Sequence, residues 1–277
     1  MISEYTGLFR KTLDKWVEDD GITNSAALSF HAVIGLPSLI LFTLFLGSVF
    51  LKQQFIEASI ITDVSIFADD IVITALHNLF TQLSVDSSFS LGIIFSFAIY
   101  LWSAGNIFFQ LQKMINKMWG LESSAKSWLK KFVRKKMSSL IAAIVFGMLV
   151  ALSTLFEVIF FAISDNLEST LSLPTDAVRY ASLFISFFTL VLFFMYLYRV
   201  LPEATLGLKY VFIGSLLTVI LLTIGKYIMG LYLSYSNLAT LYGTIGSILV
   251  IFMWIYMSSI FVTFMVEFTG VYSESGY

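Results

Sequence analysis

The sequence is poor in several residue types, and each shortage excludes a class of protein. It has no cysteine, which excludes disulfides, thiolate metal sites and a cysteine nucleophile. Its two histidines, His31 and His77, leave too little material for a histidine metal centre, so we expect no metal or cofactor. Charged side chains make up only 12% of the 277 residues, about half the fraction that is usual in soluble domains. A water-soluble globule is therefore excluded.

Long apolar runs take the place of the missing charge. Hydrophobic residues make up 58% of the chain, and the mean hydropathy is +0.89. A hydrocarbon core of roughly 30 Å requires about 20 apolar residues of helix. The stretches that meet this requirement are 26–50, 88–110, 138–163, 178–200, 211–235 and 242–270. Because backbone groups in lipid must bond within their own segment, we predict an all-α, polytopic membrane protein with six transmembrane helices.

The positions of the Lys and Arg side chains predict the orientation in the membrane. Of the 16 such residues, 13 lie before the first expected span, in the second and fourth connections or at the span end beside them, and two lie in a connection or at a span end on the opposite side. Positive charge favours the cytoplasmic side. We therefore predict a multi-pass membrane protein whose N- and C-termini are both cytoplasmic, and the family resemblance given below implies the plasma (inner) membrane.

Three further segments are too short or too polar to span, and we expect residues 1–277 to form a single integral membrane domain. Residues 1–20 carry an apolar stripe at helical spacing, which predicts an amphipathic helix along the inner interface. Residues 52–87 predict an acidic, amphipathic outer segment that could serve as a lid over the bundle. Residues 123–137 predict a basic cytoplasmic helix.

The basic helix interleaves apolar side chains with six cations. These are Lys126, Lys130, Lys131, Arg134, Lys135 and Lys136. We expect them to bind anionic lipid head groups on the cytoplasmic side, at roughly 1 kcal/mol per cation. RNA binding is the alternative, but the segment has no RNA-binding motif and the orientation already explains its charge. The expected partners are the bilayer and its anionic lipids, and no nucleic acid.

Two ionisable residues fall within the outer half of the expected spans. Glu157 in the third span and Lys226 in the fifth lie at similar depth and can pair if these helices touch. Ionisable groups inside a membrane are costly and point to a functional site. The alternative is architectural, because such a pair can also serve only to orient two helices.

A second group of polar side chains falls near the cytoplasmic ends of the spans. Its members are His31, Asn106, Gln110, Arg199 and Glu267. We expect Arg199 and Glu267 to form an ion pair, with the two amides of the second span hydrogen-bonding to other helices. His31 is expected to be a hydrogen-bonded core histidine. An architectural role is again the alternative for the whole group.

Small residues repeat at every fourth position in the third span, at Ala143, Gly147 and Ala151. This spacing lets two helix backbones approach closely. The neighbour is either another helix of the same chain or a second copy in a homo-oligomer, and the sequence leaves both open.

Several ordered motifs carry a family resemblance. They are Ala26-Ala27-Leu28-Ser29-Phe30, Trp102-Ser103-Ala104-Gly105-Asn106, Asn116-Lys117-Met118-Trp119, Tyr198-Arg199-Val200-Leu201-Pro202 and Leu241-Tyr242-Gly243-Thr244-Ile245-Gly246, followed by Trp254-Ile255-Tyr256 and Glu267. In this order they resemble the YihY/virulence factor BrkB family of inner-membrane proteins. The resemblance implies about six spans and no settled molecular function. The chain departs from the family pattern where Met265 and Val266 replace a small Gly-Ala pair before the glutamate.

The function classes separate as follows. Some members of that family carry the label of a tRNA-processing ribonuclease. This sequence has no zinc motif and no room for a soluble catalytic domain. We therefore expect that the protein is not an enzyme, and we assign no catalytic residue. The leading hypothesis is transport or translocation of a lipid or envelope-related substrate. The alternative is a non-transporting membrane scaffold for envelope assembly.

The predicted orientation has a direct test. An impermeant reagent applied from outside should leave the stretch from Lys126 to Lys136 unmodified, because the bilayer separates this stretch from the reagent. Modification of these side chains in sealed cells would contradict the predicted orientation.

Overall fold

The computed structural model describes residues 2–50, 61, 73–74, 89–121, 133, 135–149, 152–153, 175–235 and 244–275. These ranges are helical with short turns and contain no strand, so the all-α prediction is confirmed for them. Glu157 and almost all of the predicted outer segment lie outside the described residues.

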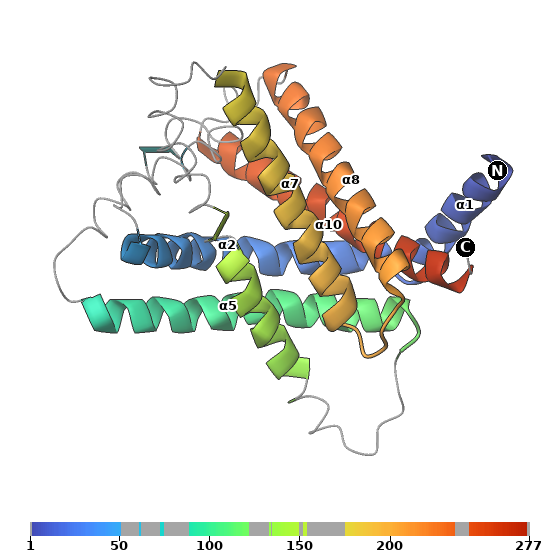
Figure 1. The fold of residues 1–277 in the computed structure, drawn as a ribbon, viewed down its shortest axis with the longest axis horizontal. Helices are drawn as coiled ribbons and strands as arrows, with labels where there is room; N and C mark the ends of the chain where they lie inside the picture. The colour runs from blue at the N-terminus through green and yellow to red at the C-terminus, as the bar shows by residue number, and fades with distance from the viewer. Residues whose placement is uncertain are drawn as a thin grey trace.

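Six labelled helices follow one another along the chain. They are α1 (Ile2–Glu18), α2 (Gly21–Phe50), α5 (Phe89–Met118), α7 (Thr175–Val200), α8 (Leu208–Tyr235) and α10 (Thr244–Glu274) (Figure 1). Residues 135–149 are also helical and run from the end of the predicted basic segment into the third expected span. The helices α2, α5, α8 and α10 extend past the expected spans at the ends predicted to be cytoplasmic.

Three helices of the described chain are long and apolar enough to cross a membrane. These stretches are Leu183–Val200 in α7, Leu208–Tyr232 in α8 and Leu249–Glu274 in α10. The helices α2 and α5 have 30 residues each, or about 45 Å at 1.5 Å per residue. A helical membrane protein is thereby confirmed, while the number of six spans stays a prediction.

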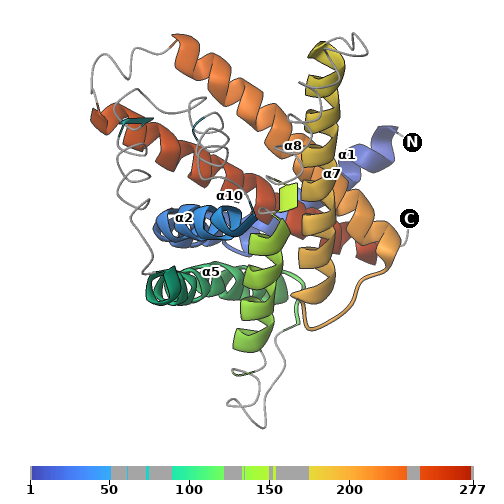
Figure 2. The same cartoon turned by 60° about the vertical axis from the view of Figure 1, so that its left-hand side comes forward.

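The helices pack as an irregular bundle in which α10 is the shared neighbour. Figures 1 and 2 show α2 and α5 side by side and α7 beside α8, and α10 contacts α1, α2, α5 and α8. The start of α2, the end of α5, the end of α7, the start of α8 and the end of α10 gather at one end of the bundle (right in Figure 1). Helices that cross the same layer in alternating directions place their ends in this way.

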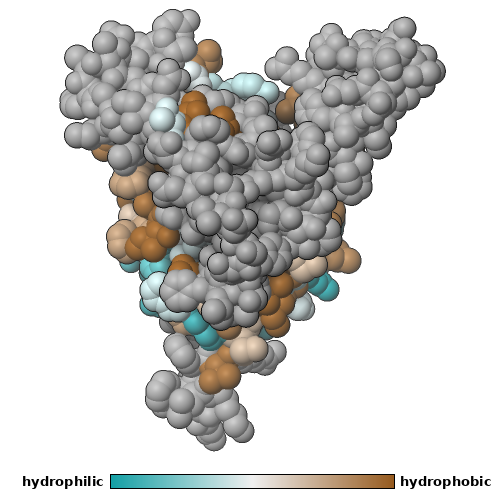
Figure 3. Space-filling model, turned by 90° about the vertical axis from the view of Figure 1, so that its left-hand side faces the viewer, coloured by the Kyte–Doolittle hydropathy of each residue, from teal (hydrophilic) through white to brown (hydrophobic). Residues whose placement is uncertain are grey.

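Large apolar side chains remain exposed along the outside of the bundle. Figure 3 shows hydrophobic residues along the flanks of the molecule. A soluble monomer rarely exposes contiguous apolar surface on this scale, whereas lipid tails cover it without cost. Examples on four helices are Phe30, Trp102, Phe184, Phe188, Ile228 and Leu231.

The small residues of the third expected span do form a packing face. The Tyr100 hydroxyl of α5 donates to the carbonyl of Ala143 at 2.6 Å, and both residues are fully buried. A Cβ atom added at Gly105 would lie 2.9 Å from the Leu140 side chain. The neighbour of this face is therefore α5 of the same chain. Ala151 lies outside the described residues.

The turn between α1 and α2 depends on a close backbone approach. Asp20 has a φ of 57°, and the Asn24 amide donates to the carbonyl of Asp19 at 2.8 Å. A Cβ atom at Gly21 would lie 2.2 Å from the indole of Trp16. The turn thus folds the Trp16 ring against the start of α2.

Gly214 provides a test of the contact between α8 and α10. A Cβ atom there would lie 2.1 Å from Thr269 Oγ1 and 3.0 Å from its Cβ, so rotation of the threonine cannot relieve the clash. We expect Gly214→Ala to lower the free energy of unfolding by about 1–3 kcal/mol. Gly230→Ala in the same helix has open space around it and is the matched control. Equal melting temperatures of the two variants in detergent would contradict this packing.

Candidate functional site

Polar contacts between distant segments gather at the end of the bundle where the helix ends meet. They join α1, the start of α2, the end of α5, residues 135–139, the loop between α7 and α8, and the end of α10. We call their central members the end cluster. It consists of Lys15, Gln112, Asn116, Lys135, Glu203 and Glu267.

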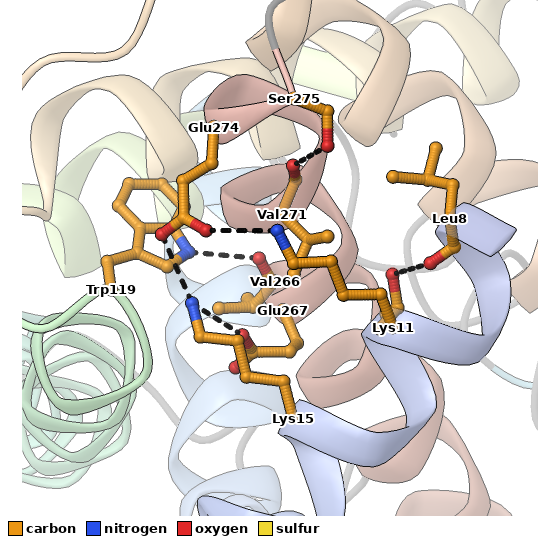
Figure 4. Close-up of polar contacts among 10 residues, drawn as sticks. Leu8, Lys11, Lys15, Trp119, Val266, Glu267, Val271, Glu274 and Ser275 are labelled. Carbon is orange, nitrogen blue, oxygen red and sulfur yellow. Dashed lines mark hydrogen bonds and ion pairs between the residues drawn. The ribbon is translucent and has the colours of Figure 1, made fainter. Parts of the chain in front are cut away.

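The most deeply buried charge of the end cluster is Glu267 in α10, whose side chain is fully buried. Lys15 of α1 places its ammonium 3.3 Å from Glu267 Oε1 and 3.3 Å from Glu274 Oε1. Lys11 lies 3.7 Å from the other oxygen of Glu274 (Figure 4). Because the pair with Glu267 is sheltered and the two pairs with Glu274 are half exposed, the first contributes most to holding α1 in place.

The charge on Lys15 is stabilised by these carboxylates. Burial opposes the charge, but Glu267 and Glu274 outweigh it, so the pKa of Lys15 is raised above its ordinary value. A raised lysine pKa contributes stability below the unfolded pKa and loses it as the pH rises through the folded pKa. Lys15 therefore stays an ammonium throughout the neutral range.

Hydrogen bonds to Thr263, one turn before Glu267 in α10, also hold α1 and α2 in place. The indole of Trp16 donates to Thr263 Oγ1 at 3.1 Å, and the hydroxyl of Ser25 in α2 lies 2.7 Å from the same oxygen. On another side of α10, the indole of Trp119 donates to the carbonyl of Val266 at 3.0 Å. The end of α10 is thus bonded to three other segments.

Two amides one helical turn apart in α5 hold the connection between α7 and α8. Gln112 donates to the carbonyl of Leu201 at 2.6 Å and accepts from Ser139 at 3.3 Å. Asn116 accepts from the backbone N–H of Glu203 at 2.9 Å. Both amides are buried. Because an unpaired buried polar group is costly, these bonds favour the observed position of the connection.

The basic segment takes part in the same end cluster. Lys135 pairs with Glu203 at 3.1 Å, and Lys136 donates to Asn106 Oδ1 at 2.7 Å and lies over the ring of Phe109. Both cations thus have partners within the chain, and the binding of anionic lipid head groups that we expect for them stays a prediction. The other four expected cations lie outside the described residues, and their binding of anionic lipid stays a prediction.

The expected ion pair between Arg199 and Glu267 is wrong. Arg199 donates to the carbonyl of Leu206 in the loop that follows α7, whereas Glu267 pairs with Lys15. The reason is that α1 folds back onto the end of α10 and reaches the carboxylate there. Arg199 instead closes the turn that starts directly after it.

The remaining expected residues are placed as follows. His31 Nδ1 lies 2.8 Å from the carbonyl of Ala27 in its own helix, as is typical of a structural histidine. Gln110 is half-buried on α5. Lys226 is exposed on α8, and its partner by hypothesis, Glu157, lies outside the described residues. The Glu157–Lys226 pair therefore stays a prediction.

Sequence reasoning missed Lys15, Gln112 and Asn116. Lys15 had been assigned to the interface as part of an amphipathic helix, although it lies one position before the buried Trp16. The two amides lie beyond the expected end of the second span, where a polar side chain attracts no notice. The signal that could have found Asn116 is its place at the head of the motif Asn116-Lys117-Met118-Trp119.

Comparison with known proteins identifies the family. A model described as Virulence factor BrkB matches residues 12–276. The chain belongs to the virulence factor BrkB family. The match covers α1 from Thr12 onward, every other labelled helix and all members of the end cluster.

BrkB-family relatives with a curated description carry the name UPF0761 membrane protein. One from Idiomarina loihiensis is 25% identical over 185 residues, which cover 66% of this chain and 60% of the relative. One from Legionella pneumophila is 24% identical over 256 residues, which cover 89% of this chain and 57% of the relative. The chain thus spans less than two thirds of the length of these relatives. No solved structure matches it.

Two of the motifs that carry the family resemblance lie at the end cluster. The motif that contains Trp119 contacts α10 beside Glu267, and the motif that contains Leu201 accepts the bond from Gln112. Where the expected small pair is replaced, Val266 is fully buried. The close approach is provided one turn later by Gly270, whose added Cβ would lie 2.7 Å from the ring of Trp119.

The role of Gln112 can be tested with a neighbouring amide as control. We expect Gln112→Leu to lower the free energy of unfolding by about 1–3 kcal/mol, because it leaves the buried Leu201 carbonyl without its donor. Gln110→Leu changes a half-buried amide of the same helix and should have a smaller effect. Thermal unfolding in detergent measures both. If the Gln110 variant were the less stable one, the proposed clamp on the α7–α8 connection would be wrong.

Proposed function

We propose that this BrkB-family membrane protein translocates a lipid or another envelope-related amphiphile, and that the end cluster closes one end of its path. The observation that carries the proposal is Glu267, a fully buried carboxylate within the apolar stretch Leu249–Glu274 of α10. Ionisable groups are expensive in a membrane, and where they occur they mark the paths of substrates and ions.

The chemistry of the closure supports a cycle of opening and closing. The described bonds of the end cluster are ion pairs and hydrogen bonds between separate segments, such as Lys15 with Glu267 and Lys135 with Glu203. Such contacts can exchange partners or water, whereas an interdigitated apolar core resists separation. Movement of α1 or of the α7–α8 connection would open this end.

The exposed flanks support a lipid as the class of substrate. Apolar side chains such as Phe184 on α7 and Ile228 on α8 face outward, where acyl chains contact them. A lipid substrate reaches the bundle laterally from the bilayer, so the path needs no wide aqueous vestibule. The four cations between residues 126 and 134 would attract anionic head groups on the cytoplasmic side.

A membrane scaffold for envelope assembly is the second candidate. It is favoured by the ion pairs and hydrogen bonds of the end cluster, because they hold separate helices together as a purely structural device would. The two functions differ in one measurable property, because a scaffold moves nothing across the bilayer.

Reconstitution into liposomes that contain a fluorescent phospholipid tests the proposal. With the full chain, a membrane-impermeant quencher should remove more fluorescence than the outer leaflet holds. Glu267→Ala should slow this movement, since a transporter that cannot close one end completes no cycle. Lys11→Ala, which changes a half-exposed partner of Glu274, is the control and should keep the rate. Absence of lipid movement by the unaltered protein, at normal stability, would favour the scaffold.

A further inference from the structure

Glu267 lies where a single positive charge compensates it. Both of its oxygens are buried, and apart from the Lys15 ammonium the described part of the chain places no hydrogen-bond donor on either of them. A carboxylate in this position is tolerated in two ways, either paired with a cation or neutralised by a proton. The same side chain can therefore exist in two states that differ by one proton.

Lys15 has a second carboxylate partner, Glu274, so it stays paired when Glu267 takes up a proton. Its ammonium lies 3.3 Å from Glu274 Oε1, at the same distance as from Glu267 Oε1. Glu274 is 54% exposed and Lys15 is 27% exposed, so water reaches the lysine from the side of Glu274. When Glu267 takes up a proton from this water, Lys15 keeps its own proton and remains paired with Glu274.

The surrounding charges act on Glu267 in opposite directions. On α1 and in the turn that follows it, Lys15 attracts the charged carboxylate and Asp19 repels it, and on α10 Glu274 also repels it. The helices α5 and α8 bring Lys117 and Lys209 to the same end of the bundle. Lys117 is bound to the carbonyl of Asp19 and to the carboxylate of Asp20. The charges that act on Glu267 are thus those of two acids and one lysine.

We propose that Glu267 is a proton-binding site that controls how tightly α1 is seated on the bundle. With a charged Glu267, the ion pair to Lys15 holds α1 against α10. With a proton on the carboxylate this attraction is lost, and α1 is held by the remaining contacts, among them the bond from Trp16 to Thr263 and the rings of Phe9 and Phe264. The proposal is independent of any transported substrate.

Single cysteines on α1 provide the test, because the native chain has none. Thr12 is fully buried, so a cysteine in Thr12→Cys reacts faster when α1 loosens from the bundle. Gly7 is exposed with open space around it, so the rate of Gly7→Cys reports only how the ionisation of a thiol changes with pH. The measured quantity is the ratio of their maleimide-labelling rates in the purified full chain. This ratio should rise as the pH falls from 8 to 5. When Glu274→Gln is added to both cysteine variants, the ratio of labelling rates should still rise as the pH falls.

Two further variants separate proton binding from a merely structural pair. In Glu267→Gln the ratio should be raised by roughly tenfold at pH 8, because a sheltered ion pair is lost, and should no longer depend on pH. In Lys15→Gln the slope should reverse, because an unpaired buried carboxylate is tolerated better once it is protonated. A rise that persists in Glu267→Gln, or a Lys15→Gln variant with the native slope, would overturn the proposal.

Discussion

The burial of one carboxylate at the end of α10 is the constraint on which the described architecture depends. The Glu267 side chain is fully buried, and its carboxylate is acceptable in this position only if a cation lies beside it or a proton neutralises it. The cation comes from α1, a helix that does not itself qualify as a span. The need to neutralise this group therefore explains why an amphipathic helix at the start of the chain folds back onto the last helix.

The other polar contacts at this end follow the same logic. Burial favours hydrogen-bond partners for the amides of Gln112 and Asn116, and the backbone of the α7–α8 connection supplies an acceptor for Gln112 and a donor for Asn116 Oδ1. Lys135 then balances Glu203 on the same connection. One end of the bundle is thus joined by bonds that depend on charge and hydrogen bonding, whereas its flanks present apolar side chains to the membrane. Membership of the BrkB family fits this arrangement, since Asn116 and Glu267 of the end cluster belong to the motifs that carry the family resemblance.

Sequence reasoning succeeded for features that depend on neighbouring residues. The boundaries of α7 and α8 were expected within about three residues, because an apolar run of helical length is a local property that a bilayer translates directly into a span. Sequence reasoning failed for Arg199. We expected this residue to pair with Glu267 because both lie near the same end of the bundle, but the turn beside Arg199 offers the carbonyl of Leu206.

Hydropathy and the placement of Lys and Arg are thus enough to derive a helical membrane protein and to predict its orientation, because the bilayer acts on each segment separately. The partner of each buried polar group was decided only when the helices packed. Trp16 and Thr263 are 247 positions apart and still share a hydrogen bond, and the ion pair of Lys15 with Glu267 is formed beside it. Such a pairing depends on which helix faces meet and at what depth, and these are properties of the whole bundle that no single stretch of sequence contains.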